Sequence, residues 1–164
     1  MKTRTLAVNG LVAALYIAVT FAIAPFGFTN IQFRVSEMFN HLVIFNKKYF
    51  YGIVVGVFLA NLLFSPMPMF DITFGVGQTI ISLVITIISA RYVKSIVKRM
   101  IINTLVFTFT MCIIALEIYL ISDVPISFFL TWGTTAVGEF AVMAVGIPIM
   151  LFINKRLAFH KLVD

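Results

Sequence analysis

Carboxylate side chains lie in or beside long apolar runs of this sequence, where charged groups are rare. Glu139 is inside the last run, Glu117 lies close to the C-terminal end of the run before it, and Asp71 stands at the start of another. A carboxyl group at membrane depth costs several kcal/mol unless it is paired or neutralised, and such residues normally mark function. We therefore interpret Glu139 as a ligand-binding residue. The alternative for Glu139 is a structural glutamate that is protonated or hydrogen-bonded.

Polar residues share helical faces with these carboxylates. Thr131, Thr135 and Glu139 follow one another at intervals of four residues, and Asn61 lies near the end of a further apolar run. Residues three or four apart meet on one face of a helix. Four helices are thus predicted to turn polar groups inward at similar depths. The face that begins with Asp71 comprises Asp71, Gly75, Gln78 and Ser82.

Two of these candidates also have local explanations, and both explanations stay open. Asp71 stands where a helix N-cap belongs, and aspartate is a preferred N-cap residue without any ligand. Arg34 and Glu37 are three residues apart and can form an ion pair on one helix.

The sequence argues against catalysis, a bound metal and nucleic acid. Only His41 lies near the apolar part of the chain, His160 is in the C-terminal tail, and Cys112 is the single cysteine. These residues supply neither the several convergent ligands of a metal site nor a nucleophile with its base. The chain also lacks a P-loop. The net charge of +6 comes from short basic clusters that flank apolar runs. We therefore predict no enzyme, no cofactor and no nucleic-acid partner.

The elements that must position the polar groups are membrane helices. Apolar residues make up 62% of the chain, charged residues only 11%, and the mean hydropathy is +1.10. The fold class predicted is an all-α integral membrane protein, with residues 1–164 forming a single six-helix domain. The second apolar segment is much shorter than the roughly 20 residues that span a bilayer, so either neighbouring helices must shelter it or the backbone before it must dip into the protein. The six segments cover about residues 6–24, 34–45, 49–64, 71–90, 100–121 and 128–153.

The basic residues predict the orientation of this bundle. When the chain is threaded through the membrane six times, nearly every lysine and arginine falls on one side, and only Arg34 falls on the other. Lysine and arginine in short loops mark the cytoplasmic face. Both termini are therefore expected in the cytoplasm, and the carboxylates are expected to form a site that opens outward.

Small residues recur every four positions on two of the predicted helices. Such stripes let helix backbones approach closely in a membrane. On the third segment we expect the stripe to pack inside the protein. On the first segment an internal contact and an external helix partner both remain open. The stripes are Gly10, Ala14, Ala18 and Ala22 in the first segment and Gly52, Gly56 and Ala60 in the third.

Several short motifs follow one another in register along the chain. They are the segment 31–37 (IQFRVSE), Gly56, Ala60-Asn61, the segment 71–75 (DITFG), Asn103, Glu117 and Gly138-Glu139. Together they resemble the QueT family, the queuosine-precursor S components of energy-coupling factor (ECF) transporters, over about residues 5–155. Two departures stand out, because Leu42-Val43 occupies a place where the family often has Leu-Pro, and Thr108 one where glycine is usual.

The resemblance implies a six-helix protein of the bacterial cytoplasmic membrane that captures a preQ1-like precursor from outside. It also implies a transmembrane coupling subunit, two ATPase subunits, and a docking surface at Ala14 and Ala18. An aminomethyl-deazaguanine is a flat cation with adjacent N–H donors, which suits carboxylates. Our hypothesis is that Glu139 and Asp71 hold its polar ends and that residues 25–32 close over it. The remaining pocket residues would be Glu37, Glu117, Asn61 and Gln32, with Arg34 fixing Glu37 and with Phe33, Phe39, Phe128 and Trp132 stacking on the ring.

A competing hypothesis is a proton-coupled secondary carrier of small organic cations. In that case Glu139 would alternate between a proton and the substrate. The convergence of polar groups toward one face favours the S component, because a carrier must offer its site to both sides. An intramembrane enzyme would need a nucleophile or metal set that the sequence does not supply.

Overall fold

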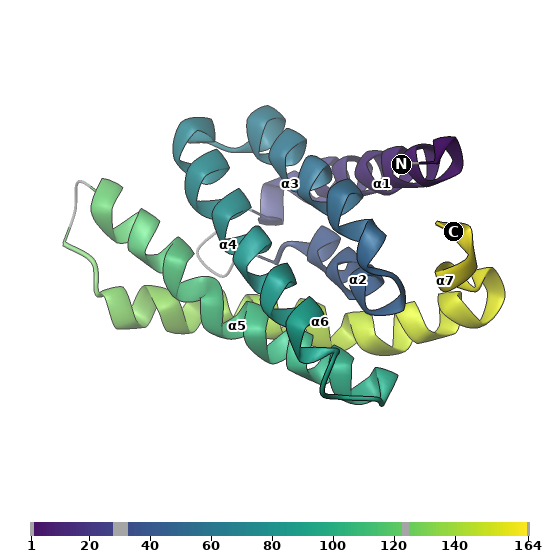
Figure 1. Ribbon diagram of the computed structural model, residues 1–164. Helices are drawn as coiled ribbons and strands as arrows, with labels where there is room; N and C mark the ends of the chain where they lie inside the picture. The colour runs from purple at the N-terminus through teal and green to yellow at the C-terminus, as the bar shows by residue number, and fades with distance from the viewer. Residues whose placement is uncertain (1, 28–32, 123–124, 164) are drawn as a thin grey trace.

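The computed structural model describes residues 2–27, 33–122 and 125–163, and in these ranges the regular structure is helical (Figure 1). Five of the helices are long and apolar enough to cross a membrane, and a shorter apolar helical stretch covers Val35–Phe45. The all-helical membrane class is confirmed, as is the short second helix. The helices are α1 (Thr3–Gly27), η1 (Val35–His41), α2 (Leu42–Phe45), η2 (Lys47–Tyr49), α3 (Phe50–Phe64), α4 (Pro68–Ser89), α5 (Ile96–Ile121), α6 (Phe128–Leu157) and α7 (Phe159–Leu162).

The short segment made of η1 and α2 lies in the middle of the bundle. η1 contacts α1, α5 and α6, while α2 contacts α4 and α5. Asn40, His41 and Leu42 are accordingly buried. The long neighbours thus shelter the backbone of a helix that is too short to cross a bilayer alone, as the sequence led us to expect.

The small residues of α3 allow a close approach to α1. A Cβ atom on Gly52 would lie 2.7 Å from the carbonyl oxygen of Asn9, and one on Gly56 would lie 2.8 Å from Cβ of Tyr16. The Gly52 amide also donates to Asn9 Oδ1 at 2.8 Å, which satisfies one of the N–H groups left over at the start of a helix. Internal packing of the α3 stripe is confirmed.

The small residues of α1 face the other way. Gly10, Ala14, Ala18 and Ala22 are all exposed, and a Cβ atom on Gly10 would meet nothing within 4 Å. The contact between α1 and α3 therefore uses the opposite face of α1. An external partner for the α1 stripe stays a prediction.

Alanine substitutions at Gly52 and at Gly10 are expected to have opposite effects on stability. Gly52→Ala is expected to lower the unfolding free energy by about 1–3 kcal/mol, the usual cost of an extra methyl group in a packed interface. Gly10→Ala should raise it by about 0.5–1 kcal/mol, since alanine loses less backbone entropy in a helix. Thermal unfolding of the purified protein in detergent measures both shifts. Equal shifts for the two variants would contradict the close approach at Gly52.

The C-terminal segment folds back on the bundle, which the sequence did not suggest. α6 ends at Leu157, its C-cap Ala158 has a left-handed φ of 49°, and α7 follows. The carbonyl oxygen of Val163 then accepts hydrogen bonds from Thr5 Oγ1 and Lys48 Nζ, both at 3.0 Å. The hydroxyl of Tyr49 donates to the carbonyl of Phe159 at 2.8 Å. This segment ties the start of α1 to the turn before α3.

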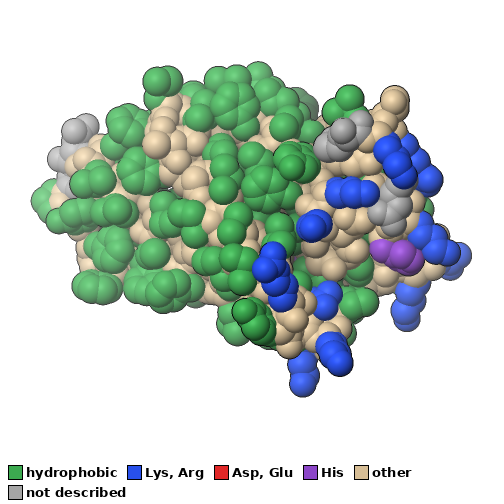
Figure 2. All heavy atoms as spheres, viewed as in Figure 1, with side chains coloured by type: hydrophobic (Ala, Val, Ile, Leu, Met, Phe, Trp, Pro, Cys, Tyr) green, Lys and Arg blue, Asp and Glu red, His purple; other side chains and the backbone are tan. Residues whose placement is uncertain are grey.

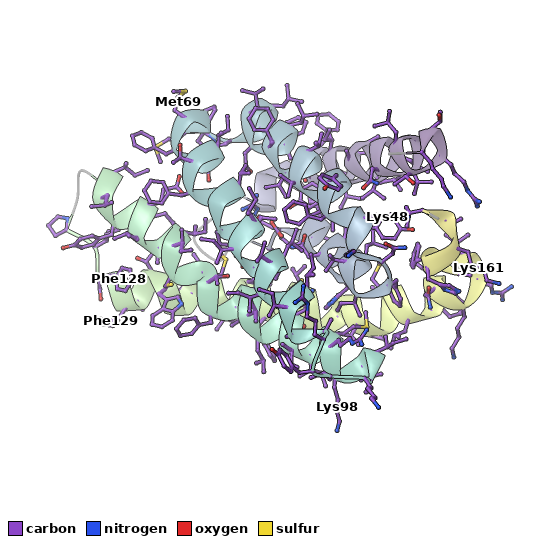
Figure 3. All side chains as sticks on the ribbon, viewed as in Figure 1. Lys48, Met69, Lys98, Phe128, Phe129 and Lys161 are labelled. Carbon is purple, nitrogen blue, oxygen red and sulfur yellow. The ribbon has the colours of Figure 1, made fainter. Side chains whose placement is uncertain are left out.

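The charged side chains divide the molecule into two ends. Figure 2 shows lysine and arginine side chains gathered at one end of the visible face, and apolar side chains over the rest. Lys48, Lys98 and Lys161 lie toward that basic end, whereas Met69 and Phe128 lie toward the opposite end (Figure 3). The ends of the chain also lie at the basic end (Figure 1). We refer to the two as the basic end and the apolar end.

Candidate functional site

The helical elements bring five of the predicted charged residues into one group, which we call the carboxylate cluster: Arg34, Glu37, Asp71, Glu117 and Glu139. Arg34 interacts electrostatically with Glu37, Asp71 and Glu139, and Glu117 interacts with Asp71 and Arg34. The contributing elements are far apart in sequence, since η1, α4, α5 and α6 each supply a carboxylate. Each of the four acids therefore interacts electrostatically with the one guanidinium group.

Arg34 links η1 to α3 and α4 through Asn61. Its Nη2 atom donates to Asn61 Oδ1 at 2.8 Å, and Asn61 Nδ2 donates to the backbone oxygen of Asp71 at 2.9 Å. Arg34 Nε also lies 3.6 Å from Glu37 Oε1. The local ion pair considered from the sequence is present, and Arg34 holds Glu37 as proposed. Arg34 and Asn61 are both buried, so this arrangement is fixed by the fold and not by solvent.

Glu37 is the carboxylate with the most protein partners. Besides the ion pair with Arg34, its Oε1 atom accepts a hydrogen bond from the Tyr16 hydroxyl at 2.7 Å. Its Oε2 atom accepts one from Asn40 Nδ2. Both oxygens of Glu37 are thus engaged, which suits a residue that supports the cluster.

Asp71 is not the N-cap of its helix, so that expectation was wrong. α4 begins at Pro68 with Met67 as its N-cap, and Asp71 lies in the first turn. Proline fits the first helical position because its missing N–H would have no partner there. The Asp71 carboxylate instead accepts a hydrogen bond from Ser65 Oγ in the turn after α3. Asp71 is the half-buried member of the carboxylate cluster.

Glu117 and Glu139 differ from Glu37 because each has an oxygen without a hydrogen-bond partner among the described residues. Their side chains are 2% and 1% exposed, and the unpartnered atoms are Oε2 of Glu117 and Oε1 of Glu139. Buried polar atoms without partners are rare in native proteins and call for an explanation. The sequence left open that Glu139 is a hydrogen-bonded structural glutamate. Its Oε1 atom has no hydrogen-bond partner among the described residues, so it does not support that alternative. Among the described residues, these two oxygens therefore have no protein donor.

Two further buried groups lack partners within the described part of the chain, Asn40 Oδ1 and Trp132 Nε1. Asn40 was not predicted, although its position three residues after Glu37 places both on one helical face. A third acceptor and one donor, besides the two carboxylate oxygens, are thus buried without a partner among the described residues.

The aromatic candidates separate into two places. The Trp132 ring lies 6.2 Å from Phe128 and 5.5 Å from Phe109 between centroids, toward the apolar end where Phe128 lies (Figure 3). Phe33 is 41% exposed and lines an apolar hollow of about 210 Å³ between η1 and α6, together with Val35, Met38, Ala141, Val142 and Val145. The Phe39 ring lies 6.4 Å from Tyr16. Stacking on a ligand stays a prediction for each.

Gln32 lies outside the described residues. So do residues 28–31, which belong to the segment 25–32 that was expected to close over a ligand.

Several polar residues that shared the predicted inward faces serve helix packing. Gln78 Nε2 donates to Thr110 Oγ1 at 2.9 Å, and Ser82 Oγ lies 2.7 Å from the same Thr110 oxygen.

Tyr16, which supports Glu37, was not predicted, because a single tyrosine in an apolar run has no local signal. Only the packing of α1 against η1 reveals its role.

His41 belongs to a separate buried chain of hydrogen bonds. Thr86 Oγ1 donates to Asn103 Oδ1 at 2.7 Å. Because this bond fixes which side of the Asn103 amide is the oxygen, the amide nitrogen faces His41 Nδ1 and donates to it at 3.2 Å. Nε2 must then carry the proton, and it donates to the Met143 carbonyl at 2.9 Å. His41 thus joins η1 to α5 and α6. In the described part of the chain, no three His, Cys, Asp or Glu side chains are grouped so that they could hold a metal ion.

Comparison with known proteins agrees with this architecture. The family model of the QueT transporter matches residues 6–155. The chain is 33% identical to the "Queuosine precursor transporter QueT" of Lactococcus lactis subsp. cremoris (strain MG1363) over 169 aligned residues, which cover 98% of each chain. No solved structure matches the chain. The chain therefore belongs to the QueT transporter family, and with its apolar helices it is a multi-pass transport protein of the bacterial cell membrane and not an enzyme.

Proposed function

We propose that this protein is the substrate-binding S component of an ECF importer and that it captures a queuosine precursor of the aminomethyl-deazaguanine type from outside the cell. The observation that carries the proposal is the pair of buried carboxylates, Glu117 and Glu139, each with an unpartnered oxygen. The name of the Lactococcus relative supports the choice of substrate.

The chemistry of the carboxylate cluster suits such a ligand. An aminomethyl-deazaguanine carries an ammonium group at one end and two adjacent N–H donors on its guanine edge. Glu139 and Asp71 would bind these two ends, Glu117 and Asn61 would complete the pocket, and Gln32 would contribute from the segment after α1. Hydrogen bonds between charged groups in a water-poor site are roughly twice as strong as neutral ones. Trp132 would add cation–π attraction or stacking on the flat ring, and Phe33 would border the site.

The difference between the two ends of the bundle supports an orientation in the membrane. In our proposal the chain is one domain with six membrane segments, the short stretch Val35–Phe45 being the second. The basic end faces the cytoplasm with both termini, in agreement with the positive-inside rule. The carboxylate cluster then opens toward the exterior, on the side of the apolar end.

Transport would depend on partner proteins. The chain contains no P-loop, so a transmembrane coupling subunit and two ATPase subunits would supply the energy. The exposed Ala14 and Ala18 would allow a helix of the coupling subunit to approach α1 closely.

A ligand panel tests the proposed substrate. The aminomethyl-deazaguanine should raise the Tm of the purified protein by roughly 5–10 °C at a hundredfold excess over its Kd, from about 2.7 kcal/mol of binding free energy. The cyano analogue, guanine and queuine should stabilise less, since the first two lack the ammonium group and queuine carries a bulky substituent on it. Adenine, which lacks the guanine edge, is the control. Absence of stabilisation by all four guanine-related compounds would refute the substrate class.

Purification from a native membrane tests the transport class. Co-purification with a coupling subunit and ATPases is expected for an S component. Precursor uptake that requires a proton gradient but no ATPase would instead identify a secondary carrier.

A further inference from the structure

Helix α1 presents two different faces. Ala14 and Ala18 are exposed on one, while Tyr16 and Thr20 are buried on the other. Successive residues of an α-helix turn by about 100°, so a side chain two positions along points to nearly the opposite side. The surface proposed to meet the coupling subunit and the surface that meets the interior therefore belong to the same two turns of one helix.

The buried face of α1 is bound to η1 by two side-chain hydrogen bonds. The Tyr16 hydroxyl donates to Glu37 Oε1 at 2.7 Å, and Thr20 Oγ1 donates to Ser36 Oγ at 2.8 Å. The ring of Tyr16 has little freedom, because Tyr16 is 0% exposed and α3 approaches it at Gly56. A displacement of Glu37 would therefore be transmitted to α1, because the Tyr16 side chain has too little freedom to compensate for it.

Glu37 is also connected to the carboxylates that have unpartnered oxygens. It interacts electrostatically with Glu139, and its ion-pair partner Arg34 interacts with Glu139 and Glu117. A cation bound among these acids would compete with Arg34 for negative charge. The Arg34–Glu37 pair, and with it the hydrogen bond from Tyr16, then has different energies in the empty and the occupied protein, which is the requirement for coupling two sites.

We propose that Tyr16 is a positioning residue that couples occupancy of the carboxylate cluster to the orientation of α1 by way of Glu37. This inference rests on the proposed function, because α1 is taken as the helix that meets the coupling subunit. Tyr16 reaches Glu37 from the α1 side, so its role is to transmit the occupied state to α1.

The variant Tyr16→Phe tests this coupling, because it removes only the hydroxyl. The Kd for aminomethyl-deazaguanine, measured by calorimetry on the purified protein, should stay within about threefold of wild type, while the maximal uptake rate in cells should fall at least about tenfold. Tyr51→Phe is the matched control, since Tyr51 lies on α3 and is 57% exposed. It should change neither quantity.

Two outcomes would overturn the inference. Wild-type uptake by Tyr16→Phe would show that the hydroxyl transmits nothing, and a loss of affinity as large as the loss of uptake would place its effect in binding alone. If Tyr16→Phe does not fold, Thr20→Val removes the second bond to η1, and the same split between Kd and uptake is required of it. The proposed function fails separately, if the wild-type protein does not bind the precursor.

Discussion

Replacing Glu139 by glutamine is expected to weaken binding of the aminomethyl-deazaguanine by at least about 30-fold. Removing one partner of a buried charge pair costs roughly 2–5 kcal/mol, and each 1.4 kcal/mol is tenfold in Kd. Glutamine has nearly the same shape as glutamate, but it has no charge for the ammonium group and places a donor where an acceptor is required. Calorimetry on the purified variant measures the loss.

Stability distinguishes a binding role of Glu139 from a structural one. Without ligand, Glu139→Gln should unfold at the same temperature as wild type or higher, because it removes a buried carboxyl group with an unpartnered oxygen. A structural glutamate would give the reverse, a lower Tm with unchanged affinity. Phe140→Leu is a suitable control, since Phe140 is the next residue on α6 and is exposed.

Replacing both Ala14 and Ala18 by tryptophan should reduce precursor uptake at least about tenfold and leave the Kd within about twofold of wild type. Bulky side chains on this stripe would prevent the close approach of a second helix backbone, on which helix association in lipid depends. Both alanines are exposed, so the protein can accept the larger side chains without repacking. Uptake by cells and calorimetry on the purified variant supply the two measurements.

Val137→Trp is the control for this double variant, because it places a tryptophan on an exposed position of another helix, α6. It should import at the wild-type rate. Normal uptake by the alanine double variant would remove the docking surface from α1 and would leave the proposed binding site untouched.

Much of the fold was predictable because membrane helices have a strong local signal. A run of apolar residues defines each long helix, and α3, α5 and α6 begin or end within a few residues of the expected positions. The exact ends of the helices depend on features that are less local than an apolar run. α4 starts at Pro68 and not at Asp71, since proline is favoured in a first turn. The α7 segment has no sequence pattern that would predict its folding back on the bundle. Hydrogen bonds from Thr5, Tyr49 and Lys48 to its backbone hold it there.

The candidate site was predictable in its carboxylates but not in their partners. Glu117 and Glu139 stand out in an apolar sequence because lipid makes a charged group costly, so its presence carries information. Thr110 does not stand out, because a threonine hydroxyl can bond to the backbone of its own helix. Tyr16 does not stand out either, because a single tyrosine in an apolar run gives no local signal of its partner.

The sequence by itself determined that this chain is a helical membrane protein with acidic residues held in its apolar segments, because apolar runs and misplaced charges are properties of single segments. The tertiary structure alone decided which acids have protein partners. Glu37 is occupied by Tyr16, Arg34 and Asn40, whereas Glu117 and Glu139 each keep an unpartnered oxygen among the described residues. The physical reason is that hydrogen-bond partners come from helices distant in sequence, and only packing brings them within about 3 Å.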